Sequence, residues 1–105
     1  MAVIEINDSN FDNEIVHSKE VVLVDFWAPL SGSCLAMEPV VDSLEKMLGK
    51  RYKFCKINID ENKELAQRYN IMSVPTLMVF KNGRVCNIMT GINGRNEIAG
   101  MLGSC

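Results

Sequence analysis

Cys34 is the residue of this chain whose type and position most clearly suggest reactivity. It follows a turn at residues 29–33, which comes directly after the apolar run Val21–Trp27, and it precedes a segment with helical spacing. Backbone N–H groups and the helix dipole favour a negative charge at the start of a helix, such as the charge of a thiolate. Cys34 is therefore a candidate for sulfur chemistry, and Ser31 lies one helical turn before it.

Asp25 is a second candidate, because it lies inside the apolar run. A strand that is apolar on both faces is typical of the centre of a parallel sheet with helices on each side. Burial disfavours the ionised form of a carboxyl group, so we expect the pKa of Asp25 to lie well above that of a free aspartate. The alternative is a polar residue at a strand end or a helix cap. Asp25, Trp27 and Cys34 gather at the carboxyl end of this strand, where α/β sheets tend to form their active sites.

The elements that must position these residues alternate between strand-like and helix-like segments, which is typical of an α/β domain. Apolar periodicity predicts strands at residues 3–6, 21–27, 52–59, 76–80 and 85–89. It predicts four helices. The first ends near residue 16, with caps offered by residues 7–10, and the others cover residues 35–48, 62–69 and 94–102. Asp60 is the predicted cap of the third helix. Asn82-Gly83 is a hairpin signal, so we expect the last two strands to be antiparallel. The simplest packing is a mixed sheet of about five strands with helices on both faces.

The composition indicates one globular domain that spans residues 1–105, with 48% hydrophobic and 23% charged residues. The net charge is −2, from 11 basic and 13 acidic residues, and no block of one sign occurs. This balance argues against binding to nucleic acid or to a membrane surface, since both favour basic clusters. No apolar run reaches the roughly 20 residues that span a bilayer, and the N-terminus lacks the features of an export signal. We therefore expect a cytoplasmic protein.

Three further cysteines and one histidine are the other soft ligands of the chain. Cys55, Cys86 and Cys105 are far apart in the sequence, unlike the short Cys-x-x-Cys pairs of zinc sites, and His17 stands alone. We expect no metal site and, in a reducing cytoplasm, no disulfide framework. Cys55 and Cys86 lie in apolar strands and should act as small hydrophobic residues. Cys105 is terminal, so we expect an exposed free thiol that can join two molecules.

The sequence as a whole resembles the thioredoxin family. The matching segments keep the family's spacing along the entire chain; they are residues 22–28 (VLVDFWA), Cys34, Pro39, residues 56–60 (KINID), residues 74–77 (VPTL), residues 80–83 (FKNG) and Gly91. The resemblance implies the thioredoxin fold, an α/β structure with a mixed central sheet. It also implies a protein-disulfide oxidoreductase that works by dithiol–disulfide exchange.

The chain departs from the family at the reactive turn. Thioredoxins have Trp-Cys-Gly-Pro-Cys there, whereas this chain reads Leu30-Ser31-Gly32-Ser33-Cys34. Ser31 thus occupies the position of the attacking cysteine, and Cys34 matches the resolving cysteine. A serine hydroxyl does not ionise near neutral pH, and its activation needs a neighbouring base, whereas the only histidine belongs to a distant segment. We expect that this chain cannot complete a two-thiol cycle.

Two explanations of Ser31 are open. One is an engineered replacement of a cysteine, which removes the sulfur nucleophile and keeps the shape of the turn. The other is a natural relative with a single thiol. We favour the replacement, because the other parts that the two-thiol reaction needs are present. Ser33 fits a natural residue better, since it adds nothing to disabling the site.

The resemblance assigns the proton chemistry to two residues. Asp25 would be the buried acid that takes and returns the proton of Cys34. Lys56 would reach over from the neighbouring strand as the partner of Asp25. For Lys56, an ordinary solvated lysine is the alternative.

The resemblance also implies a groove for an extended segment of a substrate. Pro75 would follow a cis peptide bond that faces the turn and leaves the backbone of Val74 free to pair; the alternative is a rigid start of a strand. Gly91 would let a partner backbone approach closely, or serve as a plain turn glycine. Trp27 would offer a contact surface, pack in the core, or do both. The other members of the implied substrate-binding set lie on the turn and are Gly32 and Ser33.

The activity that the resemblance implies is the reduction of disulfides in other proteins, followed by re-reduction by a thioredoxin reductase of the flavin or the iron–sulfur type. It implies no cofactor and no metal, and we expect a monomer. Two other classes stay open. One is a non-enzymatic binding or chaperone module that uses the groove alone. The other is an iron–sulfur carrier similar to single-thiol glutaredoxins, although those keep the first cysteine of the motif and lose the second.

Overall fold

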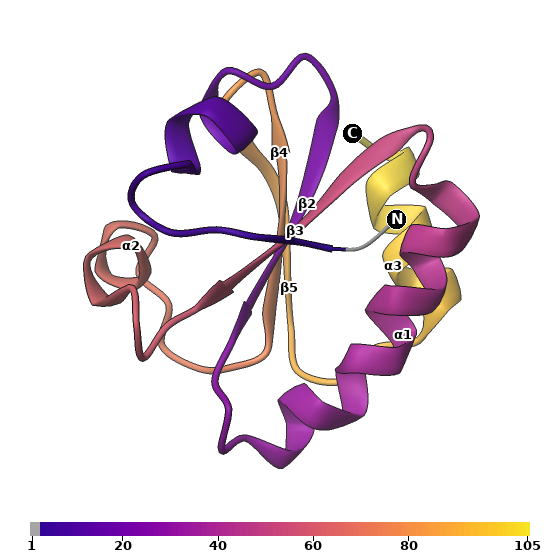
Figure 1. The fold of residues 1–105 in the computed structure, drawn as a ribbon. Coiled ribbons are helices and arrows are strands. Elements are labelled where there is room, and N and C mark those ends of the chain that lie inside the picture. The colour runs from indigo at the N-terminus through magenta and orange to yellow at the C-terminus, as the bar shows by residue number, and fades with distance from the viewer. Residues whose placement is uncertain (1–2) are drawn as a thin grey trace.

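Five strands form one mixed sheet in the computed structural model, which describes residues 3–105 (Figure 1). The strands are β1 (Ile4–Glu5), β2 (Val21–Trp27), β3 (Tyr52–Asn58), β4 (Thr76–Lys81) and β5 (Arg84–Thr90). Their order across the sheet is β1-β3-β2-β4-β5. The first three are parallel, whereas β4 is antiparallel to β2 and β5 is antiparallel to β4. The expected mixed sheet is confirmed.

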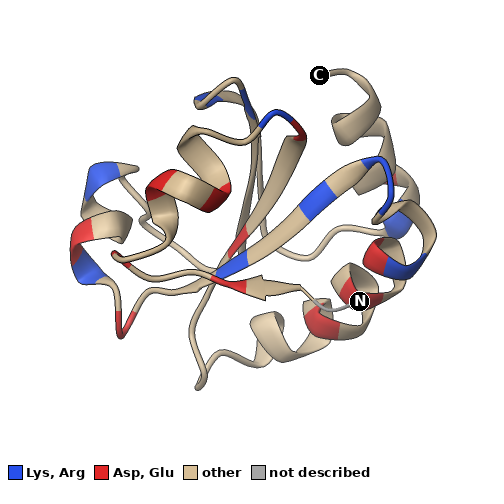
Figure 2. Ribbon diagram, turned by 45° about the horizontal axis from the view of Figure 1, so that its top comes forward, with Lys and Arg blue, Asp and Glu red and all other residues tan. Residues whose placement is uncertain are grey.

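Helices cover both faces of this sheet, as expected. They are η1 (Asp12–Val16), α1 (Gly32–Leu48), α2 (Lys63–Arg68) and α3 (Arg95–Gly103). Figure 1 shows α1 and α3 on one side of the sheet and α2 with the N-terminal helix on the other. No helix in residues 3–105 is long and apolar enough to cross a membrane. Basic and acidic positions are interspersed along the ribbon (Figure 2).

The central strand β2 explains why the site faces α1. Successive side chains of a strand point to opposite faces. Val22 and Val24 belong to the core on the side of η1 and α2, whereas Leu23 belongs to the core that Met37 of α1 and Ile98 of α3 share. Asp25 has the same parity as Leu23, so its side chain lies on the α1 side.

Two of the predicted caps are wrong, because the side chain of Asn7 and the backbone of Asp60 take part in turns instead. Asn7 Oδ1 accepts a hydrogen bond from the Ser9 backbone at 2.8 Å, and the cap position of η1 is Phe11, which has no side-chain hydrogen bond. The Asp60 backbone donates to Asn58 Oδ1 at 2.9 Å. The cap position of α2 is therefore Asn62, not Asp60.

The boundaries of the first strand and of α1 also differ from the prediction. The first strand covers only Ile4–Glu5, and α1 begins at Gly32, three residues before the predicted start at residue 35. The hairpin between β4 and β5 is confirmed. Its two turn residues have positive φ, 54° at Asn82 and 76° at Gly83, which is the backbone of a tight hairpin turn.

Candidate functional site

The turn between β2 and α1 brings Ser31 and Cys34 together. Ser31 is the N-cap of α1, and its Oγ accepts a hydrogen bond from the Cys34 backbone N–H at 3.2 Å. Serine is a preferred N-cap, which explains why the helix begins directly after it. Cys34 lies in the first helical turn as a free cysteine that is 5% exposed. Gly32 and Ser33, between the two, are exposed.

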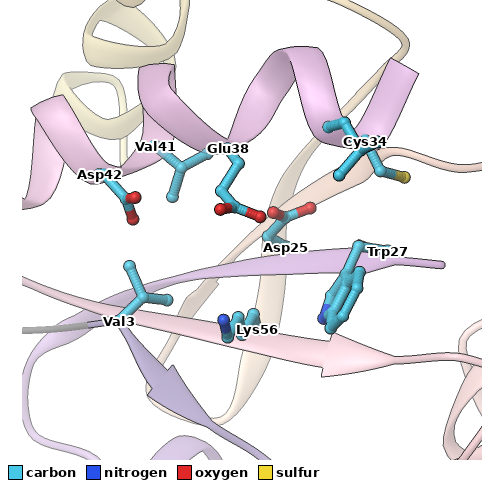
Figure 3. A pocket seen from close by; sticks show the side chains of 9 residues that line it. Val3, Asp25, Trp27, Cys34, Glu38, Val41, Asp42 and Lys56 are labelled. Atoms are coloured by element: carbon cyan, nitrogen blue, oxygen red, sulfur yellow. The ribbon is translucent and has the colours of Figure 1, made fainter. Parts of the chain in front are cut away.

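A small cavity of about 30 Å³ lies beneath this turn, between α1 and the sheet (Figure 3). This volume is enough for a water molecule, since a single water needs about 10–15 Å³ of such space. The residues that line it are Val3, Asp25, Trp27, Cys34, Leu35, Glu38, Val41, Asp42 and Lys56. The cavity therefore brings together Asp25, Cys34 and Lys56, the three residues to which the family resemblance assigned the proton chemistry.

Asp25 is the buried acid of the cavity. It is 7% exposed, and within residues 3–105 its Oδ1 has no hydrogen-bond partner. Burial raises the pKa of Asp25 to about 7, the Lys56 ammonium lowers it in part, and the carboxylates of Glu38 and Asp42 raise it further. The expected direction is confirmed, and a group with this pKa can both accept and release a proton near neutral pH.

Lys56 lies opposite Asp25 in the parallel pairing of β2 with β3. Its Nζ is 5.6 Å from the centre of the Trp27 ring, a cation–π arrangement. Lys56 forms no ion pair with Asp25. Among the described residues the one ion pair joins Lys53 to Glu14. Lys56 thus influences Asp25 through its charge at a distance and contacts Trp27 directly.

Trp27 packs beside the turn. It is only partly buried and lines the cavity, which places it beside the turn. Its Nε1 is buried without a hydrogen-bond partner in the described part of the chain.

Two carboxylates of the site, Glu38 and Asp42, were missed in the sequence. Figure 3 shows the carboxylates of Asp25 and Glu38 directed toward each other, the first from β2 and the second from α1. A signal was available, because Cys34, Glu38 and Asp42 follow one another at intervals of four and so share one face of a helix. The helix places a second acid beside the buried one.

The implied substrate groove lies at the same edge of the sheet. The Val74–Pro75 peptide bond is cis, as expected, and Thr76 directly after it pairs with Phe26 near the end of β2. Among residues 3–105, no hydrogen bond uses the backbone N–H or C=O of Val74. The Gly91 N–H donates to the Pro75 carbonyl at 2.9 Å, which holds the two segments side by side.

Gly91 has a backbone conformation that favours glycine and free space around its Cα. Its φ of 78° lies in the left-handed region that favours glycine, and a Cβ built there would meet nothing within 4 Å. Exposed apolar side chains flank this end of the sheet, with Leu30 at 97%, Met72 at 86% and Ile92 at 63% exposure.

One prediction for the remaining cysteines is confirmed and two are wrong. Cys55 is buried in the sheet, and this burial raises its pKa to about 12, so its thiol is inert. Cys86 and Cys105, by contrast, form a disulfide with a Cα–Cα distance of 6.2 Å. Cys86 is exposed because β5 is an edge strand, and the end of α3 returns Cys105 to it, which sequence spacing alone does not reveal.

These features define a thiol protein of the thioredoxin fold: a helix that begins at a reactive turn, a buried acid beneath it and a cis-proline at the same sheet edge. Comparison with known proteins agrees, since the family model described as Thioredoxin matches residues 2–104.

Curated relatives give the same result. Thioredoxin of Bacillus subtilis is 40% identical over 98 residues, which cover 93% of this chain and 92% of that protein. Thioredoxin 1 of a Nostoc species is 42% identical over 90 residues, covering 86% and 84% of the two chains. Thioredoxin of Rickettsia prowazekii is 40% identical over 93 residues, covering 89% of each. The chain belongs to the thioredoxin family, whose members are protein-disulfide oxidoreductases.

Proposed function

We propose that this chain is a thioredoxin whose reactive turn lacks its first sulfur, so that the complete reaction needs a thiol at residue 31. The observation that supports this most directly is the shared cavity beneath the turn, which Cys34 and Asp25 both line. In the complete form, a thiolate at residue 31 attacks a disulfide of a target protein and forms a mixed disulfide. Cys34 then attacks the sulfur at residue 31 and releases the reduced target.

Asp25 supplies the proton chemistry of the second step. Cys34 must lose its proton to become a nucleophile, and Asp25 is an acid with a pKa of about 7 that lines the same cavity. The cavity has room for a water molecule that passes this proton between them. Glu38 is exposed and faces Asp25, so it offers the next acceptor on the way to solvent.

With serine at residue 31, the chain performs neither of these two steps. Activation of a serine hydroxyl requires a base within hydrogen-bond reach. His17 is exposed and precedes the start of β2, whereas the turn follows the end of β2. Ser31 Oγ instead accepts a hydrogen bond from the helix that it caps. Cys34 is the only thiol of the turn.

The residues around the turn favour an engineered replacement at residue 31. Asp25, Lys56, the cis Pro75 and Gly91 keep the arrangement that a two-thiol reaction uses. We further propose that the complete protein acts as a monomer in the cytoplasm and is re-reduced by a flavin or iron–sulfur reductase. Its substrates would be disulfides in extended segments that pair with the free backbone of Val74.

A second candidate function is a binding module that holds a partner segment without chemistry. The observation in its favour is the open groove itself, since Val74 has free backbone groups and Gly91 has empty space above it. Such a module would bind an extended segment equally well with or without sulfur at residue 31.

The test is the reduction of insulin by the Ser31→Cys variant, with dithiothreitol as electron donor. We expect the variant to reduce insulin and the parent chain to remain at the background rate. The matched control is Ser31→Cys combined with Cys34→Ser, which should form a stable mixed disulfide and turn over slowly. If Ser31→Cys stays inert while the parent chain and the variant bind an extended peptide equally well, the binding module is the better account.

A further inference from the structure

We propose that the Cys86–Cys105 disulfide is a second thiol–disulfide exchange site, which small thiols open and close while the protein stays folded. This site lies at the opposite end of the sheet from Ser31 and Cys34. It supplies a two-electron couple that the single thiol of the turn cannot supply.

The two sulfur sites lie at opposite ends of the sheet. Because β4 is antiparallel to β2, Thr76 at its start lies beside Phe26, close to the reactive turn, and Phe80 near its end lies beside Val22. Phe80 in turn pairs with Val85, the residue before Cys86. Figure 1 shows the C-terminus at one end of the sheet and the turn before α1 at the other. The disulfide is therefore independent of the reactive turn.

A β-bulge positions Cys86 for this bond. Val79 pairs with Asn87 whereas Phe80 pairs with Val85, so Cys86 is the extra residue that has no partner on β4. Bulges change the direction of a side chain relative to the regular alternation of a strand. At Cys86 the side chain meets the C-terminal residue that follows α3, and the disulfide forms there.

The bond is accessible to an external thiol on the side of Cys86. β5 is an edge strand, and Cys86 is exposed, whereas the free cysteines Cys34 and Cys55 are buried. Exposed disulfides exchange more readily than buried ones, because a thiolate must reach one of the two sulfurs.

Lys81 holds the backbone of Cys105 in place beside the hairpin. Lys81 Nζ donates a hydrogen bond to the Cys105 carbonyl at 2.8 Å, and Lys81 pairs with Arg84 across the hairpin. Cys86 is the exposed cysteine of the pair, so an external thiolate reaches its sulfur and the sulfur of Cys105 leaves.

The exchange takes place in two steps. A thiolate of a small thiol attacks Cys86 Sγ, the bond between Cys86 and Cys105 breaks, and Cys105 leaves as a thiolate. A second small thiolate attacks the outer sulfur of this mixed disulfide and releases the thiolate of Cys86. Two thiols are oxidised to one small disulfide, the protein takes up two electrons, and the two protons of the small thiols end on Cys86 and Cys105.

The fold does not depend on this bond for its packing. Ile98, Met101 and Leu102 anchor α3 in the core that α1 and the sheet share. The hydrogen bond of Lys81 also holds the C-terminal residue. Opening of the disulfide therefore leaves two free thiols on a folded protein, an exposed one at Cys86 and a half-buried one at Cys105, in contrast to a bond whose reduction requires unfolding.

The test is alkylation of the intact chain with N-ethylmaleimide before and after treatment with dithiothreitol, followed by mass spectrometry of peptides. In protein purified without reductant, we expect Cys86 and Cys105 to be unmodified and linked within one molecule. After dithiothreitol both should be modified, Cys55 should stay unmodified, and the far-ultraviolet circular dichroism should not change. A Cys34→Ser variant should give the same result at Cys86 and Cys105, because the two sites are independent.

Three results would overturn the proposal. They are modification of Cys86 and Cys105 before reduction, a link between two molecules in place of one within a molecule, and reduction that occurs only in denaturant. The outcome is separate from the insulin assay. Replacement of both Cys86 and Cys105 by serine should abolish the exchange and leave insulin reduction by a Ser31→Cys protein unchanged.

Discussion

Lys56 lies opposite Asp25 in the β2–β3 ladder, yet its ammonium group is 5.6 Å from the Trp27 ring centre and forms no ion pair with the carboxylate. Asp25 is consequently a buried acid without a direct counter-ion. Burial raises its pKa to about 7, the charge of Lys56 lowers the pKa in part, and the carboxylates of Glu38 and Asp42 raise it further. The same arrangement makes Asp25 suited to exchange a proton at neutral pH, which a firmly paired aspartate would not do.

Stability should fall with rising pH because of Asp25. The pKa of this group is about 7 in the folded protein and near its usual 3.8 in the unfolded chain, so the folded protein retains a proton that the unfolded chain has lost. The stabilisation is complete below about pH 4 and is lost as the pH rises through about 7. It amounts to about 4 kcal/mol at most, from 1.36 kcal/mol for each pH unit between the two pKa values.

Asp25→Asn tests this relation. We expect the variant to be more stable than the parent chain at pH 8 by about 3–4 kcal/mol and to be close to it at pH 4. Urea unfolding at both pH values measures the difference. Asp60→Asn is the matched control, because Asp60 is exposed and lies outside the cavity, so it should leave the stability nearly unchanged at both pH values. A stability difference that is the same at both pH values would contradict the assigned pKa.

Glu38 and Lys56 should shift the titration of Asp25 in opposite directions. The carboxylate of Glu38 raises the pKa of Asp25 and the ammonium of Lys56 lowers it. We therefore expect Glu38→Gln to lower this pKa and Lys56→Gln to raise it, which carbon-13 NMR of the Asp25 carboxyl group measures directly. Glu64→Gln on α2, across the sheet, should leave the titration unchanged. Shifts of the same sign in both variants would exclude a charge effect.

The cap of α1 should contribute to stability even though Ser31 lacks redox chemistry. Ser31→Ala removes the side chain that accepts from the Cys34 N–H, and loss of a serine cap costs about 1 kcal/mol. Ser33→Ala changes the same residue type in the same turn, where the serine is exposed and makes no cap, and should cost less than about 0.5 kcal/mol. Urea unfolding compares the two variants. Equal losses of unfolding free energy in the two variants would mean that the cap hydrogen bond of Ser31 does not stabilise the protein.

The disulfide between Cys86 and Cys105 should stabilise the protein, because it closes a loop and so restricts the unfolded chain. The two residues are 19 apart in the sequence, and closing a loop of this size contributes about 3 kcal/mol. Replacement of both by serine should lower the free energy of unfolding by about that amount. Addition of dithiothreitol should lower the stability of the parent chain to that of the variant and leave the variant unchanged. A variant as stable as the oxidised parent would contradict the link.

Local patterns were sufficient for much of the fold. The apolar run of β2 has the bounds predicted for it, Val21–Trp27, and Asn82-Gly83 forms the predicted hairpin. These successes depend on interactions between residues that are close in sequence, such as strand alternation and turn geometry. The caps at Asp60 and residues 7–10 were wrong because Asn7 and Asp60 take part in turns, and the observed cap positions, Phe11 and Asn62, make no side-chain cap hydrogen bond that a sequence pattern could reveal.

The chemistry of the turn was also visible in the sequence. The spacing of Ser31 and Cys34 on the first helical turn, and the burial of Asp25 in an apolar strand, follow from periodicity alone. Periodicity places a residue on a face and says nothing of what lies across from it. The approach of Glu38 to Asp25, the contact of Lys56 with Trp27 and the bond between Cys86 and Cys105 were therefore decided by the packing of α1 and α3 on the sheet and by one bulge in β5.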